Sequence, residues 1–389
     1  MVKFTVHLFF LGLIVLAIAS CKKPYEPPVI TSPYSYLVVD GVINTGADST
    51  FIMLSRTTNL ADSVKRSGEK GATVELITNG GATYPFTEVR NGVYAHEGLN
   101  LDVSKTYKLS IATNGQHYLS DDIIVKVTPP IDNVGFKPDN NTLQINVSTH
   151  DPSNNTKYYK WDYDDAWRFT TQYRSGYIYD ETLKNLRGRT IAEDIYTCYS
   201  TGVSSTVNIG TTVKLAQDVV SDQVIETIPS SSVKLNSRYS ILVKQYALTK
   251  EAYTFWENLK KNTEQLGSVF DPLPSEIGGN IHNVDNPAEP VVGYISASNI
   301  QTKRIYINRI QLPSWPTPYP SMCNLDSTLR SRPFVGDEVK LFLYPPTSFL
   351  AISAIEKEGN IIGYMRTFQD CADCRLYGKK KAPAFWIDN

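Results

Sequence analysis

Short segments of alternating apolar and polar residues, separated by Asn-Gly and Gly-Gly turns, recur through the first third of the chain. In residues 106–112, Tyr107, Leu109 and Ile111 alternate with polar residues, and Asn114-Gly115 follows. A period of two places apolar side chains on one face of a strand, and Asn-Gly allows the tight turn of a hairpin. The pattern therefore predicts a β-sandwich over residues 34–130.

A larger β-rich region is expected over residues 131–389, where further alternating segments occur. Residues 351–357 and 361–368 are two expected strands, and Glu358-Gly359-Asn360 between them predicts a hairpin. One segment has helical periodicity instead, near residues 249–266. Thr249 is its expected N-cap and Gly267 its expected end. Its apolar stripe consists of Ala252, Phe255, Trp256 and Leu259. The predicted fold class is therefore mainly all-β, with one main α-helix.

The N-terminus has the pattern of a secretory signal. Lys3 precedes an apolar segment, residues 4–19, that is shorter than the ~20 residues of a membrane-spanning helix. Ala19 and Ser20 are small, and Cys21 follows directly. This junction resembles the lipobox of bacterial lipoproteins, which implies a signal peptide over residues 1–20 and acyl chains, such as palmitate, on Cys21. The alternative is an ordinary signal peptide followed by a chance cysteine.

The segment after Cys21 is rich in proline and predicts an extended tether over residues 21–33. The whole chain has 38 basic and 39 acidic side chains, so no excess of positive charge favours nucleic-acid binding. After the signal, no apolar segment is long enough to span a membrane. The expected attachment to a membrane is therefore through lipid on Cys21.

Four more cysteines follow, which are Cys198, Cys323, Cys371 and Cys374. An even number in an exported protein favours disulfides, and four cysteines allow three pairings. We expect Cys371–Cys374 as a local bridge and Cys198–Cys323 as a long-range bridge. Zinc binding by four cysteines is less favoured because Cys198 and Cys323 are isolated.

The sequence contains no nucleophile elbow, phosphate loop or dinucleotide-binding motif. His96-Glu97 begins like a zinc-binding helix, but Asn100 stands where the second histidine would be. Asp162, Asp164 and Asp165 could suggest calcium, but on a strand Asp165 would point away from the other two. We therefore predict no catalytic residue, no metal and no cofactor.

The N-terminal order of strands and turns, with "Gly92-Val93-Tyr94" and "Thr106-Tyr107-Lys108-Leu109", resembles prealbumin-like or carboxypeptidase-regulatory-like sandwiches. The whole chain resembles a family of Bacteroidota lipoproteins, the domain of unknown function numbered 4249. The matching segments are spread widely. They include "Tyr36-Leu37-Val38-Val39-Asp40-Gly41-Val42-Ile43", "Lys157-Tyr158-Tyr159-Lys160-Trp161", "Gly267-Ser268-Val269-Phe270-Asp271-Pro272", "Gly278-Gly279-Asn280-Ile281", "Val292-Gly293-Tyr294-Ile295-Ser296-Ala297-Ser298" and "Cys371-Ala372-Asp373-Cys374-Arg375" with Phe385-Trp386. The resemblance implies an outer-membrane lipoprotein whose gene lies beside that of a TonB-dependent transporter.

We therefore expect a non-enzymatic accessory or binding subunit of a TonB-dependent transport system, on either face of the outer membrane. A carbohydrate-binding or adhesive surface protein is one alternative, and an unrecognised hydrolase is another. The expected partner surface is the helix with the loop of residues 267–290, because long loops inside compact domains are usually functional. The polar residues expected to face the transporter are Glu276, Asn280, His282 and Asp285. The alternative is that the helix only plugs the end of a sandwich.

Overall fold

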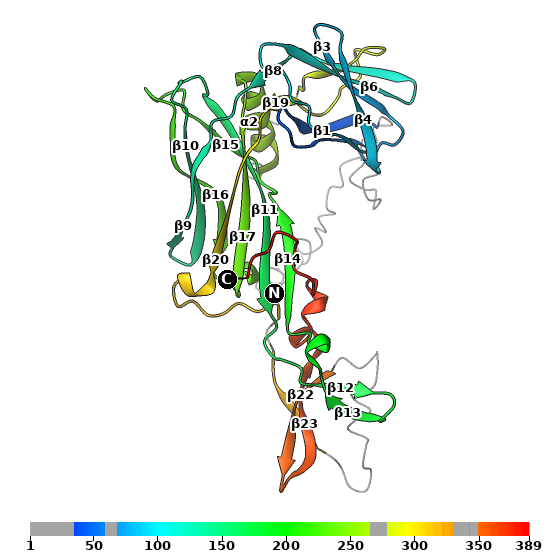
Figure 1. Cartoon of the computed structure of the whole chain (residues 1–389), viewed down its shortest axis with the longest axis vertical. Coiled ribbons are helices and arrows are strands. Elements are labelled where there is room, and N and C mark those ends of the chain that lie inside the picture. Colours follow the sequence, from blue (N-terminus) through cyan, green and yellow to red (C-terminus); the bar gives the residue numbers. More distant parts are fainter. Residues whose placement is uncertain are drawn as a thin grey trace, which may run out of the picture. The chain divides into compact units, whose positions relative to one another are not determined.

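The computed structural model describes residues 35–58, 68–264, 278–321, 323–329, 342 and 349–388. The predicted signal peptide, Cys21, the tether and Glu276 lie outside these residues. The predicted fold class is confirmed: in the described part the chain is mainly β, with a single α-helix, α2 (Lys250–Glu264) (Figure 1). Within the same ranges, no helix has the length and apolar character needed to cross a membrane.

The first sandwich has ten strands that pair in one continuous order, and most of them come from the N-terminal part of the chain. Eight of its strands are consecutive in sequence: β1 (Leu37–Asn44), β2 (Thr50–Arg56), β3 (Thr73–Thr78), β4 (Thr83–Arg90), β5 (Val93–His96), β6 (Thr106–Thr113), β7 (Gln116–Ser120) and β8 (Ile123–Lys126). The strands pair in the order β18-β7-β6-β3-β4-β5-β2-β1-β19-β8, and β6 also pairs with β8.

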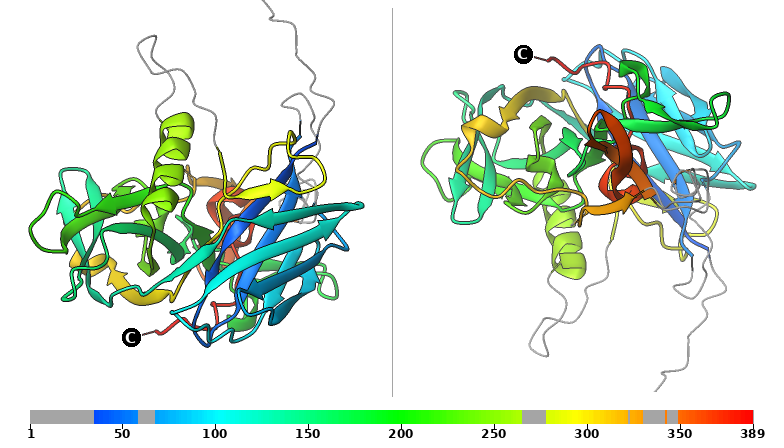
Figure 2. Two further views of the ribbon diagram at one scale, coloured as in Figure 1. Left: turned by 90° about the horizontal axis from the view of Figure 1, so that it is seen from above. Right: turned by 90° about the horizontal axis from the view of Figure 1, so that it is seen from below.

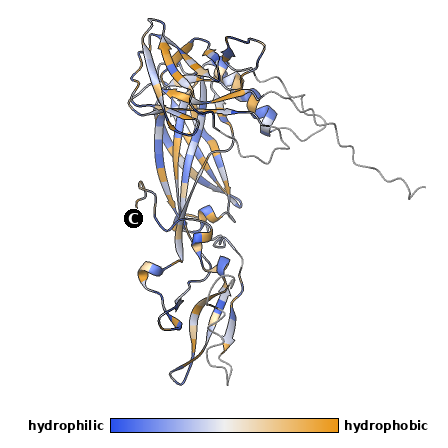
Figure 3. Ribbon diagram, turned by 90° about the vertical axis from the view of Figure 1, so that its right-hand side faces the viewer, coloured by the Kyte–Doolittle hydropathy of each residue, from blue (hydrophilic) through white to orange (hydrophobic). Residues whose placement is uncertain are grey.

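Alternation in the sequence explains why these segments form strands. Along β6, the side chains of Tyr107, Leu109 and Ile111 are buried and those between them are only partly buried. β3 pairs antiparallel to β6 and opposes Val74 to Ile111, so apolar side chains meet across the ladder. Figure 3 shows the same alternation as bands of orange and blue along the strands.

Two short strands from much later in the chain complete this sandwich. β18 (Ile281–Asn283) pairs with β7, and β19 (Ser296–Ser298) lies between β1 and β8, parallel to both. Figure 2 shows this segment in yellow beside the blue and cyan strands. The sandwich is thus not made of residues 34–130 alone, because Ile281, Ile295 and Ala297 are buried in the same apolar core.

The second sandwich has two sheets. One has the order β16-β10-β9, and the other has the order β14-β11-β17-β20, with β15 also paired to β11. Trp161 and Ile241 from the second sheet share a core with Leu143 and Ile145 from the first. The bounds are β9 (Ile131–Asp139), β10 (Thr142–His150), β11 (Tyr158–Thr170), β14 (Thr197–Val203), β15 (Asn208–Thr211), β16 (Val219–Pro229), β17 (Arg238–Ala247) and β20 (Gln301–Asn308).

A charged network is buried inside the second sandwich. The Asp165 side chain is 0% exposed, and the Lys234 ammonium lies 2.6 Å from its Oδ2. The Tyr239 hydroxyl donates to the same oxygen at 3.0 Å, and burial raises the pKa of this phenol well above its usual value. The Glu226 carboxylate lies 3.8 Å from the Lys234 ammonium. A buried charge needs such partners because desolvation is costly.

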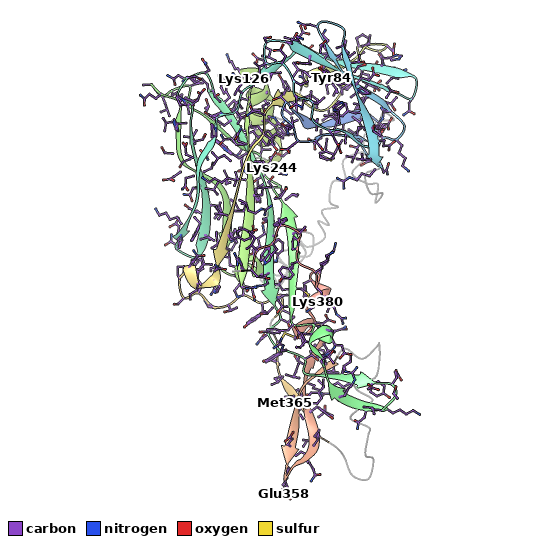
Figure 4. All side chains as sticks on the ribbon, viewed as in Figure 1. Tyr84, Lys126, Lys244, Glu358, Met365 and Lys380 are labelled. Carbon is purple, nitrogen blue, oxygen red and sulfur yellow. A yellow bond between two sulfur atoms is a disulfide. The ribbon has the colours of Figure 1, made fainter. Side chains whose placement is uncertain are left out.

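A third group of strands consists of a hairpin and a small sheet. The hairpin is β12 (Tyr177–Asp180) with β13 (Asn185–Gly188), and the sheet has the order β21-β23-β22, with β21 (Asp326–Leu329), β22 (Phe349–Lys357) and β23 (Asn360–Phe368). The predicted β22–β23 hairpin is confirmed, and Figure 4 marks Glu358 at its turn. Glu358 and Gly359 both have positive φ, 52° and 76°, as a tight hairpin turn requires. The short 3-10 helices are η1 (Ile191–Glu193), η2 (Val233–Leu235), η3 (Arg309–Gln311), η4 (Gln369–Cys371) and η5 (Cys374–Leu376).

All four cysteines of the described part are in disulfides, as predicted, but the predicted pairing was wrong. The bridges are Cys198–Cys374 and Cys323–Cys371, with Cα–Cα distances of 5.6 and 5.7 Å. Cys371 ends η4 and Cys374 begins η5, so the two are placed in successive turns. The backbone N–H of Cys374 donates to the Ile195 carbonyl, which holds η5 beside the segment that leads into β14. The side chain of Cys374 therefore meets Cys198 on β14 and not its near neighbour in sequence.

Asp151 organises the turn between β10 and β11. Its carboxylate accepts hydrogen bonds from the backbone N–H groups of Ser153, Asn155 and Thr156 at 2.9, 3.0 and 2.8 Å. The Ser153 hydroxyl donates to it as well. Burial alone would raise the pKa of this carboxyl, but the hydrogen bonds outweigh burial and lower the pKa of Asp151 to about 2.

The lowered pKa makes a testable contribution to acid stability. In the unfolded chain Asp151 has a pKa near 3.8, so its stabilisation is fully present above that value and is lost as the pH falls towards 2. We expect Asp151→Asn to lower the free energy of unfolding at pH 7 by about 2 kcal/mol. Urea unfolding from pH 7 down to pH 2.5 checks this, since the difference between variant and wild type should shrink below pH 4. A constant difference would contradict the linkage.

Candidate functional site

A cavity of about 610 Å³ opens where α2 approaches the first sandwich. Four stretches of the chain form its walls: residues 121–126, which include β8, the first turns of α2 with the residues before them, and two short segments, one before β18 and one that leads into β19. Its lining residues are Asp121, Asp122, Ile123, Ile124, Lys126, Ala247, Thr249, Lys250, Glu251, Thr254, Phe255, Asn258, Gly278, Gly279, Asn280, Tyr294, Ile295, Ser296 and Ala297.

Helix α2 divides its side chains between the second sandwich and the cavity. On one side, Tyr253 packs on Tyr158, with ring centroids 5.1 Å apart, and the Lys160 ammonium lies 4.5 Å from the centroid of the Trp256 ring. On the cavity side lie Glu251, Thr254, Phe255 and Asn258, at the i, i+3, i+4, i+7 spacing of one helix face. The contacts of Tyr253 and Trp256 hold the helix against the second sandwich, so the opposite face of the helix lines the cavity.

The start of the helix agrees with the sequence prediction. The Thr249 hydroxyl accepts from the backbone N–H of Ala252 at 3.2 Å, as an N-cap does. Ala252 and Phe255 of the predicted apolar stripe are buried, whereas Trp256 and Leu259 are only partly buried. The apolar stripe therefore packs in part against the rest of the protein, as expected if the helix plugs the end of a sandwich. The same helix also lines a cavity.

The wall opposite the helix depends on close backbone packing. A Cβ on Gly279 would lie 2.0 Å from the Gly293 carbonyl oxygen, and one on Gly293 would lie 2.0 Å from that of Val39. Asn280 then exchanges two hydrogen bonds with the Ile295 backbone, at 2.9 and 2.8 Å. The prediction that Asn280 faces a partner is therefore corrected. Its side chain is buried because the amide pairs with a peptide group in the cavity wall.

His282 and Asp285, the other predicted residues in the described part, are exposed and contact side chains on β7 or directly after it. His282 Nε2 lies 3.1 Å from an Asp121 carboxylate oxygen, and His117 Nδ1 lies 3.1 Å from Asp285 Oδ2. We call His117, Asp121, His282 and Asp285 the His–Asp patch. All four side chains are more than two-fifths exposed. Asp121 also lines the cavity, so the patch borders the cavity's rim.

Two rings form part of the cavity lining. The ring centroids of Phe255 and Tyr294 are 5.4 Å apart, with planes tilted by 37°. Burial raises the pKa of the Tyr294 phenol, and its hydrogen bond with the Thr249 side chain acts in the opposite direction. The phenol therefore stays protonated and neutral at neutral pH.

The other residues considered for chemistry have structural roles in the described part. His96 lies on β5, not on a helix, and its ring contacts the rings of Tyr84 and Phe86. Asp165 points away from Asp162 and Asp164, as predicted, and is buried in the charged network. Among the described residues, no three metal-binding side chains gather at one place.

Sequence reasoning missed the part of the site that β8 supplies. Asp121 and Lys126 are more than a hundred residues from α2 in sequence, and no motif links them. Pairing between distant segments places them in the site: β8 pairs with β19, and the backbone N–H of Asp121 donates to the Asn280 carbonyl at 2.8 Å. Gly279 in the loop after the helix is a more local feature of the site, because glycine permits the close backbone approach found at the cavity wall.

Comparison with known families gives one decisive match. The model of a family described as a domain of unknown function, DUF4249, matches residues 22–304. The chain belongs to this family. The match ends within β20, whereas the resemblance seen in the sequence extended to Phe385-Trp386. All walls of the cavity of this DUF4249 protein lie inside the matched region.

A search of curated proteins found no match to the DUF4249 protein. Among solved structures, a segment with two fibronectin type-III domains from chicken tenascin is 9% identical, with a TM-score of 0.17, and covers 55% of this chain and 93% of its own. A candidate carbohydrate-binding protein from Bacteroides uniformis is 11% identical, with a TM-score of 0.14 and coverages of 55% and 90%. A DUF3823 family protein from Bacteroides ovatus is 14% identical, with a TM-score of 0.14 and coverages of 55% and 91%. Likenesses at these TM-scores carry no argument about function.

Proposed function

We propose that this DUF4249 protein is a lipid-anchored binding subunit that serves a TonB-dependent outer-membrane transporter without catalysing a reaction. The observation that carries the proposal is the cavity beside α2, with the exposed His–Asp patch on its rim. In the proposal the cavity holds a ligand, and the patch faces the transporter. Cross-linking from the patch in intact cells should therefore capture a transporter.

The chemistry of the rim favours binding over catalysis. The histidines of the His–Asp patch are 67% and 59% exposed, and their partner aspartates are also open to solvent. Groups that act as acids or bases in catalysis are usually shielded, because burial and fixed neighbours are what tune their pKa values. Exposed charges instead contribute to recognition and to the rate of association with a charged partner.

The sequence supports the membrane anchor. An apolar signal segment ends in Ala19 and Ser20 directly before Cys21. Each buried CH₂ of an acyl chain contributes about 0.8 kcal/mol, so that more than one chain on Cys21 would hold the protein firmly. The location proposed is the outer membrane, with the proline-rich tether separating the folded part from the lipid.

Replacement of the anchor residue tests this part of the proposal. We expect Cys21→Ala to abolish acylation and to move the protein from the membrane fraction to the soluble fraction, because the lipid is its proposed attachment. Fractionation followed by a carbonate wash measures the change. Cys21→Ser, which also lacks the thiol, is the matched control and should behave identically. A Cys21→Ala protein that stays with the washed membranes would contradict the lipid anchor.

An adhesive protein that binds surface glycans is a second candidate, favoured by an aromatic cluster near the C-terminus. Trp386 contacts the rings of Tyr199 and Tyr306, with centroids 5.2 and 5.9 Å away, and Arg304 lies 3.6 Å from the centroid of the Phe385 ring. Phe385 is 41% exposed. Exposed rings of this kind can stack on sugars, so this candidate predicts that substitutions at Phe385 weaken adhesion to glycans.

A further inference from the structure

The cavity beside α2 presents polar groups that the described part of the protein leaves without hydrogen-bond or ion-pair partners. Within the described residues, no such partner occurs for the side chains of Lys250, Glu251 and Asn258, all of which line the cavity. They supply an ammonium donor, a carboxylate acceptor and an amide that can both donate and accept. A ligand in this cavity can therefore exchange hydrogen bonds in both directions.

The same cavity has an apolar side. The Tyr294 ring, packed against Phe255, faces it together with Ile124, which is 56% exposed. Aromatic and aliphatic surface of this kind lowers its free energy when an apolar face of a ligand covers it. A fully hydrated ion would leave this apolar surface uncovered. A purely apolar ligand would displace water from the polar groups and offer them no hydrogen bonds in its place.

The charges around the cavity are nearly balanced. Asp121, Asp122 and Glu251 are acidic, and Lys126 and Lys250 are basic. Asp122 lies 3.7 Å from the Lys108 ammonium, which further reduces the negative field. Charges of both signs lie around the cavity, so no strong net field selects an anionic or a cationic ligand, and the charges are compatible with a neutral ligand.

We propose that the cavity binds a neutral saccharide, an inference that rests on the proposed binding function and names its ligand class. A sugar ring has one face of C–H groups and an edge of hydroxyls that both donate and accept. The C–H face covers the Tyr294 ring, the Glu251 carboxylate accepts from hydroxyls, and Asn258 and Lys250 donate to them. The volume of about 610 Å³ falls within the roughly 300–1,000 Å³ typical of small-ligand sites.

Filling the cavity is the sharpest test, and the helix offers a matched pair of positions. Thr254 lines the cavity and Thr263 does not. Both threonines are exposed on α2, and each hydroxyl donates to the carbonyl four residues earlier, at 3.0 and 2.8 Å. Thr254→Trp places an indole in the cavity, whereas Thr263→Trp makes the same change on the same helix outside it. Glu251→Gln, with Glu257→Gln as its control, tests one hydrogen-bonding group without adding bulk.

The experiment measures binding of a panel of neutral oligosaccharides, anionic oligosaccharides and short peptides to the full-length protein in detergent, by calorimetry after an array screen. We expect a neutral oligosaccharide to bind, Thr254→Trp to weaken that binding at least tenfold and Glu251→Gln to weaken it about tenfold. The two controls should bind like wild type. The inference is overturned if only peptides or anionic sugars bind, if nothing in the panel binds, or if Thr254→Trp and Thr263→Trp have equal effects.

The transporter part of the proposed function can fail separately. A transporter cross-linked to a wild-type protein that binds no neutral saccharide would remove this inference and leave the accessory role. Saccharide binding that is sensitive to Thr254→Trp, without any transporter contact, would support the inference and remove the accessory role.

Discussion

Loss of the Cys198–Cys374 bridge should lower the free energy of unfolding by about 5 kcal/mol in the chain-entropy model of disulfides. This bridge closes a loop with a sequence separation of 176, and Cys323–Cys371 closes one with a separation of 48. The cost of closing a loop grows with the logarithm of its length, so removal of the shorter bridge should cost about 4 kcal/mol. Cys374→Ser and Cys323→Ser should therefore both destabilise strongly, with Cys374→Ser the larger effect. Urea unfolding of the two variants measures the difference.

Thiol mapping of the same variants separates this pairing from the one expected from sequence. In Cys374→Ser the free thiol should be on Cys198, because the partner of Cys374 is on β14. A local Cys371–Cys374 bridge would instead leave Cys371 free. Cys198 is buried in the folded protein, so the variant is unfolded in denaturant without reductant, alkylated at once, digested and analysed by mass spectrometry to identify the residue. Label on Cys371 and none on Cys198 would show that the pairing described here is wrong.

Lys234→Met should cost about 3–5 kcal/mol, because it leaves a buried carboxylate without its counter-charge. The Asp165 side chain is 0% exposed and lies 2.6 Å from the Lys234 ammonium. Methionine replaces most of the volume of lysine but none of its charge, so that the loss is mainly electrostatic. Chemical denaturation at pH 7 gives the free energy of unfolding for variant and wild type.

The second sandwich also contains a matched control for this substitution. Lys244 lies 2.7 Å from Asp164, but the two side chains are 29% and 43% exposed. Solvent weakens such a pair, and Lys244→Met should cost less than about 1 kcal/mol. Equal costs for the two lysines would mean that burial of Asp165 does not determine the energy of its ion pair.

Much of the strand content could be predicted because it is encoded locally. The alternation in residues 106–112 corresponds to β6, and the Glu358-Gly359-Asn360 turn connects β22 and β23. A period of two in the apolar residues indicates which face of a strand is buried, and residues that favour positive φ indicate where the chain turns back. The N-cap at Thr249 was predictable for the same reason, since the capping hydrogen bond comes from the backbone N–H of Ala252, three residues later in the same helix.

Long-range pairing was not predictable from these local signals. β18 and β19 have three residues each, which is too short for a periodic pattern to stand out, yet they complete the first sandwich. The disulfide pairing was predicted wrongly for a similar reason. Nearness in sequence suggested a Cys371–Cys374 bridge, but the direction of each cysteine side chain depends on the turn in which it lies. Asn280 has the polarity of a surface residue, and only the Ile295 backbone opposite it explains its burial.

The central claim is that the His–Asp patch of a lipid-anchored protein contacts an outer-membrane transporter, and site-specific photo-cross-linking in intact cells tests it directly. The photoreactive residue replaces His282 in one strain and Lys137, which is exposed on β9 of the second sandwich and does not belong to the patch, in a control strain. Adducts are purified under denaturing conditions and identified by mass spectrometry. We predict a TonB-dependent transporter in the adducts from position 282 and not in those from position 137. Adducts from position 282 that contain no transporter, while the protein is anchored in the membrane, would contradict the accessory role and favour glycan adhesion.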